Sequence, residues 1–257
     1  MAAIETYYLE YEIIRNRVGL LGDVTSLMGM LGLNILSVNG VSGNWRGFLL
    51  QGDTLKIETL REALENTDHI NVTALRYPYL QDVIAMRHGQ RIAPIKSKPA
   101  TYCFIREQLG LLIDFLGEIL KTGGNTVIGF RGMPQVGKTE ASIAGCVYAK
   151  KKWVLVSSTI IRQNIRYCLE PEEVSGQSVL IIDGITSVSR GDKEHLQLIK
   201  EALTAPIPKI IEHPDILIRD GDIDRKIFDY MIELRHQPED EIPTEMIPTS
   251  ISAFDIS

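Results

Sequence analysis

The sequence predicts an α/β protein in which an α+β N-terminal part precedes a small domain built on a parallel sheet. In the first third of the chain, the spacing of apolar residues switches between a period of two and a period of three to four, which is typical of strands alternating with helices. In the remainder, two short and largely apolar runs, Thr126–Phe130 and Ser178–Asp183, indicate buried strands. We expect a first domain over residues 1–78, a linker over 79–100, a second domain over 101–237 and a loose C-terminal tail over 238–257.

The N-terminal region is predicted to alternate strands and helices in the order βαββαβ. Its four strands are expected at Tyr7–Ile14, Asn34–Asn39, Trp45–Gln51 and Ile70–Tyr77. Between the first two strands, an apolar stripe marks a helix that ends at Gly32, where a glycine directly after a helix is favoured. Thr54 is the expected N-cap of a second helix. This order is that of a ferredoxin-like unit.

The run Arg15–Ile35 (R-N-R-V-G-L-L-G-D-V-T-S-L-M-G-M-L-G-L-N-I) resembles the opening of ACT domains. Members of that family have a strand, a short turn, Gly-Leu-Leu, a helix, and then Gly, an apolar residue and Asn-Ile at the start of the next strand. The resemblance covers residues 5–77, and Val18 stands where the family commonly has proline. It implies a regulatory domain that senses an amino acid or a similar small-molecule effector.

The resemblance also implies where such an effector would bind. ACT domains bind ligands at the turn before the first helix, often between two copies, which makes Asn16, Arg17 and Gly19 candidates, with Asn34 nearby. Exposed N–H groups at the start of a helix attract a carboxylate, which agrees with an amino-acid effector. The alternative is that these residues only form the turn, because many ACT domains serve in dimerisation alone. Open sheet edges favour a homodimer in either case.

The chain after this domain is predicted to hold a short helix at Tyr79–Met86 and then a basic linker that contains proline. A longer apolar helix is expected over residues 102–121, and it ends at a pair of glycines. Three later elements are expected: a helix at Lys193–Leu203, a strand at Ile216–Arg219 and a helix at Ile223–His236.

A phosphate-binding loop is predicted at Gly132–Thr139, where G-M-P-Q-V-G-K-T matches the pattern G-x-x-x-x-G-K-[ST]. A strand precedes it and a helical stretch follows, which is the context that this motif requires. Gly132 and Gly137 permit backbone angles that bring N–H groups toward a phosphate. Lys138 supplies a positive charge to the β- and γ-phosphates, and the Thr139 hydroxyl suits Mg²⁺.

The loop therefore predicts that the protein binds ATP or GTP together with Mg²⁺. The expected cofactor contacts are Gly132, Gln135, Val136, Gly137, Lys138, Thr139 and Glu140. Asp183, at the end of an apolar strand, has the place of a Walker B aspartate and is the expected metal ligand beside Thr139. Many buried strands end in an acid, so this assignment depends on the loop.

Gly184 departs from the pattern of many ATPase motors, which place Glu directly after this Asp to polarise water. The departure puts rapid hydrolysis in doubt and suits P-loop kinases, in which a substrate group attacks instead of water. It also suits a protein that binds nucleotide without turning it over.

The run Val156–Arg166 (V-S-S-T-I-I-R-Q-N-I-R) resembles the acceptor-site segment of small-molecule P-loop kinases. In those enzymes a Ser or Thr caps a helix and an Arg holds the anion of the acceptor, which implies such a role for Arg162 and Arg166. Together with Lys138 and Asp183 they are the candidate catalytic residues. The alternative is a capped surface helix with two solvated arginines.

Composition and charge narrow the classes of function. The net charge of −6 disfavours a general nucleic-acid binder, which needs a strongly basic face. No apolar run is long enough to cross a membrane. Three scattered cysteines and the lack of a secretory signal favour the cytoplasm.

The pairing of the two domains resembles a bacterial two-domain family of uncharacterised function. The sequence predicts an ACT-regulated P-loop nucleotide-binding protein that acts as an NTPase or a small-molecule phosphotransferase with Mg-ATP. The alternative is a non-catalytic regulator that responds to nucleotide and metabolite and acts through a protein partner.

Overall fold

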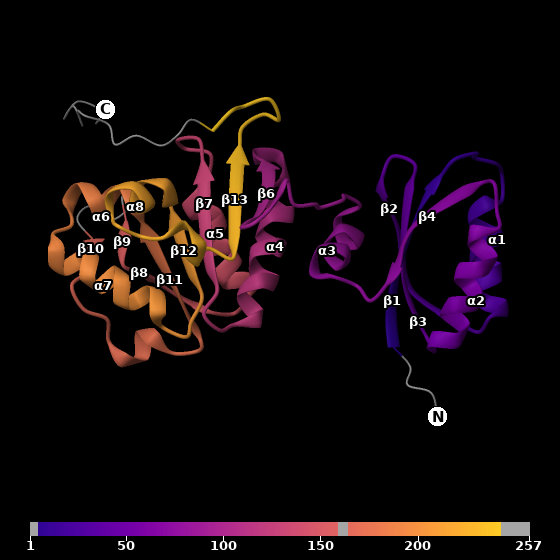
Figure 1. Cartoon of the computed structure of the whole chain (residues 1–257), viewed down its shortest axis with the longest axis horizontal. Coiled ribbons are helices and arrows are strands. Elements are labelled where there is room, and N and C mark those ends of the chain that lie inside the picture. The colour runs from indigo at the N-terminus through magenta and orange to yellow at the C-terminus, as the bar shows by residue number, and fades with distance from the viewer. Residues whose placement is uncertain (1–4, 159–163, 243–257) are drawn as a thin grey trace. The chain divides into compact units, whose positions relative to one another are not determined.

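The structure, a computed structural model, describes residues 5–158 and 164–242 (Figure 1). The chain divides into an N-terminal unit, Met1–Ala93, and a C-terminal unit, Pro94–Ser257. The first unit holds a four-stranded antiparallel sheet, and the second holds a sheet in which six strands run parallel, so the α/β class is confirmed. Among the described residues, no helix has the length and apolarity needed to cross a bilayer.

The N-terminal unit has the predicted element order. Its elements are β1 (Glu5–Ile13), α1 (Leu20–Met30), β2 (Asn34–Ser42), β3 (Trp45–Gly52), α2 (Thr54–Glu65), β4 (Ile70–Arg76) and α3 (Leu80–His88). The sheet order is β2-β3-β1-β4, and α1 and α2 bury one face of it. Gly32, at φ 65°, follows α1 as predicted. The cap of α2 is Asp53 rather than Thr54, because the Asp53 side chain accepts a hydrogen bond from the Lys56 N–H at 3.1 Å.

The other face of this sheet carries α3. Ala85 and Met86 of α3 pack against Tyr8 and Val41 in a second small core. Ion pairs add to this contact, since Arg76 pairs with Asp82 at 2.5 Å and Arg91 pairs with the buried Glu10 at 3.5 Å. The first part of the predicted linker is thus a helix, as expected, and it packs on the N-terminal unit.

The C-terminal unit is built on a sheet of order β5-β6-β13-β7-β12-β11-β8. Its strands are β5 (Lys96–Ser97), β6 (Ala100–Ile105), β7 (Val127–Gly132), β8 (Lys152–Leu155), β11 (Ser178–Asp183), β12 (Lys209–Glu212) and β13 (Tyr230–Arg235), with a small hairpin of β9 (Ser157–Ser158) and β10 (Asn164–Ile165). Its helices are α4 (Leu109–Thr122), α5 (Lys138–Tyr148), α6 (Gly184–Arg190), α7 (Lys193–Thr204) and α8 (Pro214–Asp220), with short 3₁₀ turns η1 (Arg106–Gln108), η2 (Pro171–Val174) and η3 (Arg225–Ile227).

Helices cover both faces of this sheet. α4 and α5 pack together on one face, where Phe104 of β6 contacts Phe115 of α4. Gly117 and Gly145 allow the two helices to approach closely, because a Cβ atom on either glycine would lie 2.1 or 2.9 Å from the other helix. On the other face, α7 and α8 bury Leu198, Ile199 and Leu217 against the strands.

Three predicted elements were wrong. The helix expected over 102–121 starts only at Leu109, because residues 100–105 pair with β13 as strand β6. The helix expected at Ile223–His236 is instead η3 and the central strand β13, in which Met231, Ile232 and Leu234 are buried. The strand expected at Ile216–Arg219 is helix α8, which begins at Pro214, a residue favoured at that position.

Two further predictions fall partly outside the described residues. In the run Val156–Arg166, where a capped helix was predicted, Ser157–Ser158 and Asn164–Ile165 pair as antiparallel strands, and residues 159–163, including Arg162, lie outside the described residues. Most of the predicted tail, residues 243–257, also lies outside them.

Candidate functional site

The Gly132–Thr139 segment, which we call the glycine loop, joins the carboxyl end of β7 to the start of α5. Gln135 and Gly137 have left-handed backbones, with φ of 57° and 102°, an arrangement that turns successive N–H groups toward one side. Gly137 is the N-cap of α5, and none of the described side chains caps it. Gly132 must lack a side chain, because a Cβ atom there would lie 2.8 Å from the carbonyl oxygen of Leu234.

Lys138 is held inside this loop. Its side chain is only 7% exposed, and its Nζ donates hydrogen bonds to the carbonyl oxygens of Gly132 and Met133 at 2.9 and 3.0 Å. A charge that is withdrawn from water needs such partners. The ammonium therefore sits among backbone oxygens that it can exchange for those of a ligand.

Glu212 is a site residue that sequence reasoning missed. It ends β12, is 5% exposed, and accepts hydrogen bonds from the Thr139 hydroxyl at 2.7 Å and the Ser142 hydroxyl at 3.2 Å. Burial raises the pKa of Glu212, and the charge of Asp183 raises it further. The available signal was the run Lys209–Glu212, a short apolar strand that ends in an acid, as Ser178–Asp183 does.

Asp183 ends β11, next to Glu212 in the strand register. Its carboxylate caps α6: Oδ1 accepts from the N–H groups of Ile185 and Thr186 at 2.9 and 3.3 Å, and Oδ2 accepts from the Thr186 hydroxyl at 3.0 Å. The two predicted metal ligands, Thr139 and Asp183, are therefore separated by the strand that carries Glu212, and the Thr139 hydroxyl is bonded to Glu212.

Gly184 has a steric reason to be glycine. A Cβ atom there would lie 2.4 Å from the carbonyl oxygen of His213 and 3.1 Å from that of Glu212. No side chain fits in such a space without moving one of the two strand ends. The carboxylate that many ATPases carry directly after the strand-end Asp is thus excluded at this position, whereas the neighbouring strand provides one at residue 212.

The glycine loop lies at the point where the sheet changes direction. β7 leads into α5 on one face of the sheet, whereas the adjacent β12 leads into α8 on the other face. In open α/β sheets, the carboxyl ends of two such neighbouring strands enclose a crevice that binds ligands. Both the glycine loop and Glu212 stand at this crevice.

A second missed residue, Arg106, reaches the glycine loop from the end of β6. Its Nη1 donates to the carbonyl oxygen of Val136 at 3.0 Å and to the carboxylate of Glu140 at 2.7 Å. Two of the predicted cofactor contacts are thus placed by the structure. The side chain of Val136 is buried, and the carboxylate of Glu140 bonds to Arg106. The sequence predicts Arg106 within the helix over residues 102–121, whereas in the structure Arg106 directly follows strand β6.

Of the two arginines predicted to hold an acceptor, Arg162 lies outside the described residues, and no described contact brings Arg166 to the glycine loop. Arg166 pairs with Glu173 at 2.6 Å. A hydrogen bond from the Glu170 N–H and this guanidinium lower the pKa of Glu173. The Arg166 carbonyl oxygen lies 2.6 Å from Nδ1 of the buried His195, which fixes this segment beside α7.

Buried hydroxyl groups continue this network to Asp183. Nε2 of His195 lies 3.1 Å from the Ser187 hydroxyl, which lies 2.7 Å from the Ser157 hydroxyl. The Ser157 hydroxyl in turn accepts from the Asp183 N–H at 2.8 Å. The network fixes the strand end that carries Asp183.

The predicted effector residues of the N-terminal unit are more exposed. Arg17 pairs with Asp23, Gly19 is the left-handed N-cap of α1 at φ 85°, and Asn34 donates to Gln51 at 3.4 Å. Arg17 also lines a cavity of about 110 Å³ between α1 and the start of β4, which is too small for most metabolites. Asn16 is exposed.

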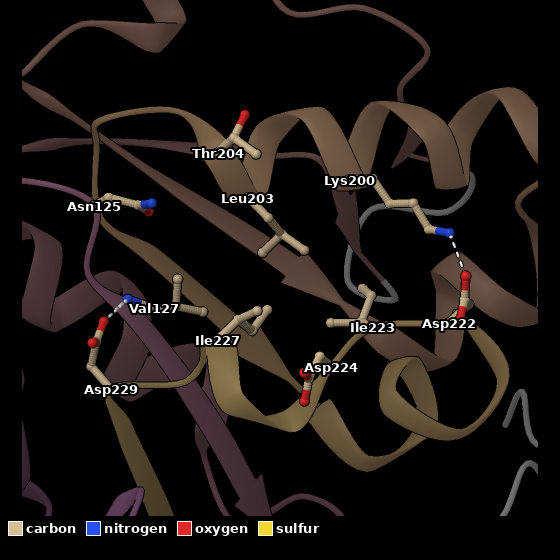
Figure 2. A pocket seen from close by; sticks show the side chains of 10 residues that line it. All are labelled: Asn125, Val127, Lys200, Leu203, Thr204, Asp222, Ile223, Asp224, Ile227 and Asp229. Atoms are coloured by element: carbon tan, nitrogen blue, oxygen red, sulfur yellow. Dashed lines mark hydrogen bonds and ion pairs between the residues drawn. The ribbon is translucent and has the colours of Figure 1, made fainter.

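A larger cavity, of about 560 Å³, lies at the opposite end of the parallel sheet, where the strands begin (Figure 2). Several of its polar side chains have partners within the protein: Lys200 pairs with Asp222 at 3.0 Å, and Asp229 accepts from the Val127 N–H at 2.9 Å. Asn125 accepts from Lys209, a lysine whose pKa is lowered to about 8 by burial. Because these groups are already bonded within the protein, we take the glycine loop rather than this cavity as the candidate site.

The fold and the site define a mixed α/β protein with a glycine loop, a buried lysine and two strand-end acids at the carboxyl edge of a parallel sheet. The chain belongs to the family described as "Protein of unknown function (DUF3388)", which matches residues 72–254. It is 46% identical over 240 residues to "Uncharacterized protein YmfK" of Bacillus subtilis (strain 168), covering 93% of this chain and 89% of that protein.

A solved structure with similarity to the chain is a phospho-2-dehydro-3-deoxyheptonate aldolase (DAHP synthase) from Thermotoga maritima. The TM-score is 0.22 at 11% identity, over 90% of this chain and 88% of that chain. A similarity this low carries no argument about the fold or the function of this protein.

Proposed function

We propose that this chain binds a nucleoside triphosphate with Mg²⁺ at the glycine loop and acts as an NTPase or a small-molecule phosphotransferase. One observation carries the proposal: the Thr139 hydroxyl and the buried Glu212 carboxylate meet at 2.7 Å beside a left-handed loop that starts a helix. A buried acid that is aimed at such a loop has a chemical use when a polyphosphate and its cation are bound there.

The phosphates would occupy the concave side of the glycine loop. N–H groups at the start of α5 attract an anion, and the positive end of the helix dipole adds to that attraction. Lys138 is already in place, since its Nζ lies 2.9 and 3.0 Å from two carbonyl oxygens of the loop. Exchanging these for phosphate oxygens gives shorter and stronger bonds, because both partners are then charged.

Magnesium would be held between the phosphates and the Thr139–Glu212 pair. Mg²⁺ prefers oxygen ligands and is usually bound by one or two protein groups together with phosphates and water. Among the described residues, no three His, Cys, Asp or Glu side chains group as a metal cage. The cation would favour the ionised form of Glu212, whose pKa is raised by burial in its absence.

Glu212 would then be placed to take a proton from the attacking group. In hydrolysis, the water oxygen bonds to the γ-phosphorus, the bond from that phosphorus to the β,γ-bridging oxygen breaks, and the water proton passes to the carboxylate. In phosphotransfer, a substrate hydroxyl replaces the water. The cation would keep this carboxylate ionised, so that it can accept the proton near neutral pH.

Asp183 favours a second candidate function, a regulator that binds nucleotide without turnover. Its carboxylate already accepts three hydrogen bonds from residues 185 and 186, which leaves less of its capacity for a metal. In that case the nucleotide would act as a conformational signal read by a protein partner.

The test measures binding and turnover separately. We expect Mg-ATP or Mg-GTP to bind the wild type, Lys138→Ala to weaken binding at least about 100-fold, and Lys121→Ala, on the exposed side of α4, to change nothing. Glu212→Gln should bind nucleotide but release phosphate about 100-fold more slowly. Binding without phosphate release under any condition supports the regulator, and no binding by the wild type ends both proposals.

We also propose that the N-terminal unit is an ACT domain that controls this site. Its βαββαβ order and its sheet order β2-β3-β1-β4 support the assignment, and the edge strands β2 and β4 offer surfaces for a homodimer. Coupling of this kind is reciprocal, so an amino-acid effector and the nucleotide must change each other's affinity by the same factor. Independent titrations would contradict the regulatory part of the proposal alone.

A further inference from the structure

Arg106 and Glu212 flank the glycine loop from opposite sides. In the sheet, β6 lies on one side of β7 and β12 on the other, so a cation and an acid approach the loop from different directions. Thr139 and Glu140 are successive residues of α5 and therefore point about 100° apart around the helix. Thr139 bonds to Glu212 and Glu140 bonds to Arg106, which separates the two sides.

Arg106 lies unusually close to the loop backbone. A Cβ atom on Gly137 would be 1.9 Å from Nη1 of Arg106, so only a glycine at this position lets the guanidinium lie there. The same nitrogen is 3.0 Å from the Val136 carbonyl oxygen. The side chain of Arg106 is 42% exposed, so part of it remains accessible to a ligand.

The expected direction of a bound nucleotide follows from the side of the glycine loop on which Glu212 lies. If the metal lies between Thr139 and Glu212, the β- and γ-phosphates lie there too, because Mg²⁺ bridges these two groups. The rest of the nucleotide would then leave the loop on the side away from Glu212, which is the side where Glu140 contacts Arg106.

We infer that Arg106 is a binding residue for the α-phosphate and nucleoside end of the ligand, and that Glu140 holds it in place until the ligand arrives. This rests on the proposed function. A guanidinium suits both parts of that end, because it pairs with phosphate and stacks on aromatic rings. The carboxylate of Glu140 would be repelled by the phosphates, which carry like charge, so its ion pair with Arg106 breaks when the nucleotide binds.

The test compares ATP with inorganic pyrophosphate, which is too short to reach Arg106. Arg106→Ala should weaken Mg-ATP binding about tenfold and change pyrophosphate binding less than about twofold. Tripolyphosphate identifies the contact: weakening like that of ATP points to the α-phosphate, and behaviour like that of pyrophosphate points to the nucleoside. Equal weakening for ATP and pyrophosphate, or none for either, overturns the inference.

Glu140→Gln provides a second readout of opposite sign. It removes a negative charge from the exit and frees the guanidinium, so ATP affinity should rise about threefold or more while pyrophosphate affinity changes less. A purely structural ion pair predicts a loss instead. The matched control is Arg219→Ala, since Arg219 is also a half-exposed arginine paired with an acid, Asp220, on α8. If the wild type binds neither ATP nor pyrophosphate, the proposed function fails. If it binds both, and Lys138→Ala weakens both, then the ratio of ATP affinity to pyrophosphate affinity in each variant tests the role of Arg106 alone.

Discussion

Two turns of this protein share one backbone design and differ in their surroundings. In both, a strand leads through a left-handed glycine into a helix that no described side chain caps: Gly19 at φ 85° before α1, and Gly137 at φ 102° before α5. At the first turn, Val18 is 101% exposed, and Arg17 pairs with Asp23 in water. At the second, two charged side chains beside the turn, Lys138 and Glu212, are buried, whereas Arg106 and Glu140 are partly exposed.

The turns at Gly19 and Gly137 differ in whether charged side chains are buried beside them. An exposed ion pair such as that of Arg17 and Asp23 contributes little to stability and needs no functional explanation. Lys138 and Glu212 are 7% and 5% exposed, and removing such groups from water is costly. Neither a left-handed glycine nor an open helix start distinguishes a site from a turn; buried and oppositely charged groups around it do.

The largest expected effect comes from substituting the two glycines. Gly137→Ala displaces the Arg106 guanidinium, which would lie 1.9 Å from the new Cβ atom, and also forces the loop out of its left-handed φ. We expect the roughly tenfold loss of Arg106→Ala and a further loss from the distorted loop, about a 100-fold loss of ATP affinity in all. Gly19→Ala meets nothing closer than 4.0 Å and should cost only the backbone strain, about 1–2 kcal/mol of unfolding free energy, with ATP affinity unchanged. Calorimetric titration and denaturant unfolding measure the two effects. Loss of ATP binding in both variants would show that the comparison is wrong.

Gly184→Glu should have the next largest effect. It places the acid where many ATPases have it, but the new Cβ atom would lie 2.4 Å from the His213 carbonyl oxygen. We expect about 2 kcal/mol or more of lost stability and reduced phosphate release, because the strand end that carries Glu212 must shift. Thermal unfolding and a phosphate assay check this. Faster phosphate release would mean that the position next to Asp183 is open after all.

The third prediction concerns pH and Glu212. Burial raises the pKa of Glu212, so over the interval from the ordinary carboxyl pKa, about 4.3, up to the higher pKa of the folded protein, the unfolded chain binds fewer protons than the folded one. The free energy of unfolding therefore falls as pH rises through this interval. The Glu212→Gln variant has no carboxyl that titrates at this position, so its free energy of unfolding should not show this fall. Denaturant unfolding of both proteins from pH 4.5 to 8 should show the wild type losing stability relative to the variant, and a constant difference would contradict the assignment.

The smallest effect tests two helix caps, one from each unit. Asp53→Ala removes the cap of α2, which should cost about 1 kcal/mol and leave nucleotide affinity unchanged. Asp183→Ala removes the cap of α6, with a similar cost, and should in addition weaken Mg²⁺-dependent ATP binding. Unfolding curves and titrations with and without Mg²⁺ distinguish the two. Equal ATP affinity for Asp183→Ala and wild type would restrict Asp183 to its capping role.

Local sequence patterns predicted the elements whose signal is local. The apolar run Ser178–Asp183 and the strand before the glycine loop were found because they are short, continuous and bounded by turns. The N-terminal element order followed from alternating periods and from Gly32. Each of these signals lies within the segment that it describes.

The failures concern segments whose structure depends on distant partners. Tyr230–Arg235 is a largely buried central strand because β6 and β7 pair with it from either side, and a short buried run of this kind is indistinguishable from a buried helix by periodicity. Misassigning it also hid β6, which pairs with it. Glu212 and Arg106 were missed for the same reason, since each reaches the glycine loop through strand order rather than through its sequence neighbours.

The close contact at Gly117 and Gly145 packs α4 and α5 tightly against each other, so we expect the two helices to move together. α4 begins three residues after Arg106, and α5 begins at Lys138, so both helices start at the candidate site and meet again along their length. A methyl group at position 117 would lie 2.1 Å from Tyr148 and would force the helices apart there. We expect such a change to shift the near ends of both helices as well, and with them the contact between Arg106 and the glycine loop, although no residue placed at the candidate site is altered.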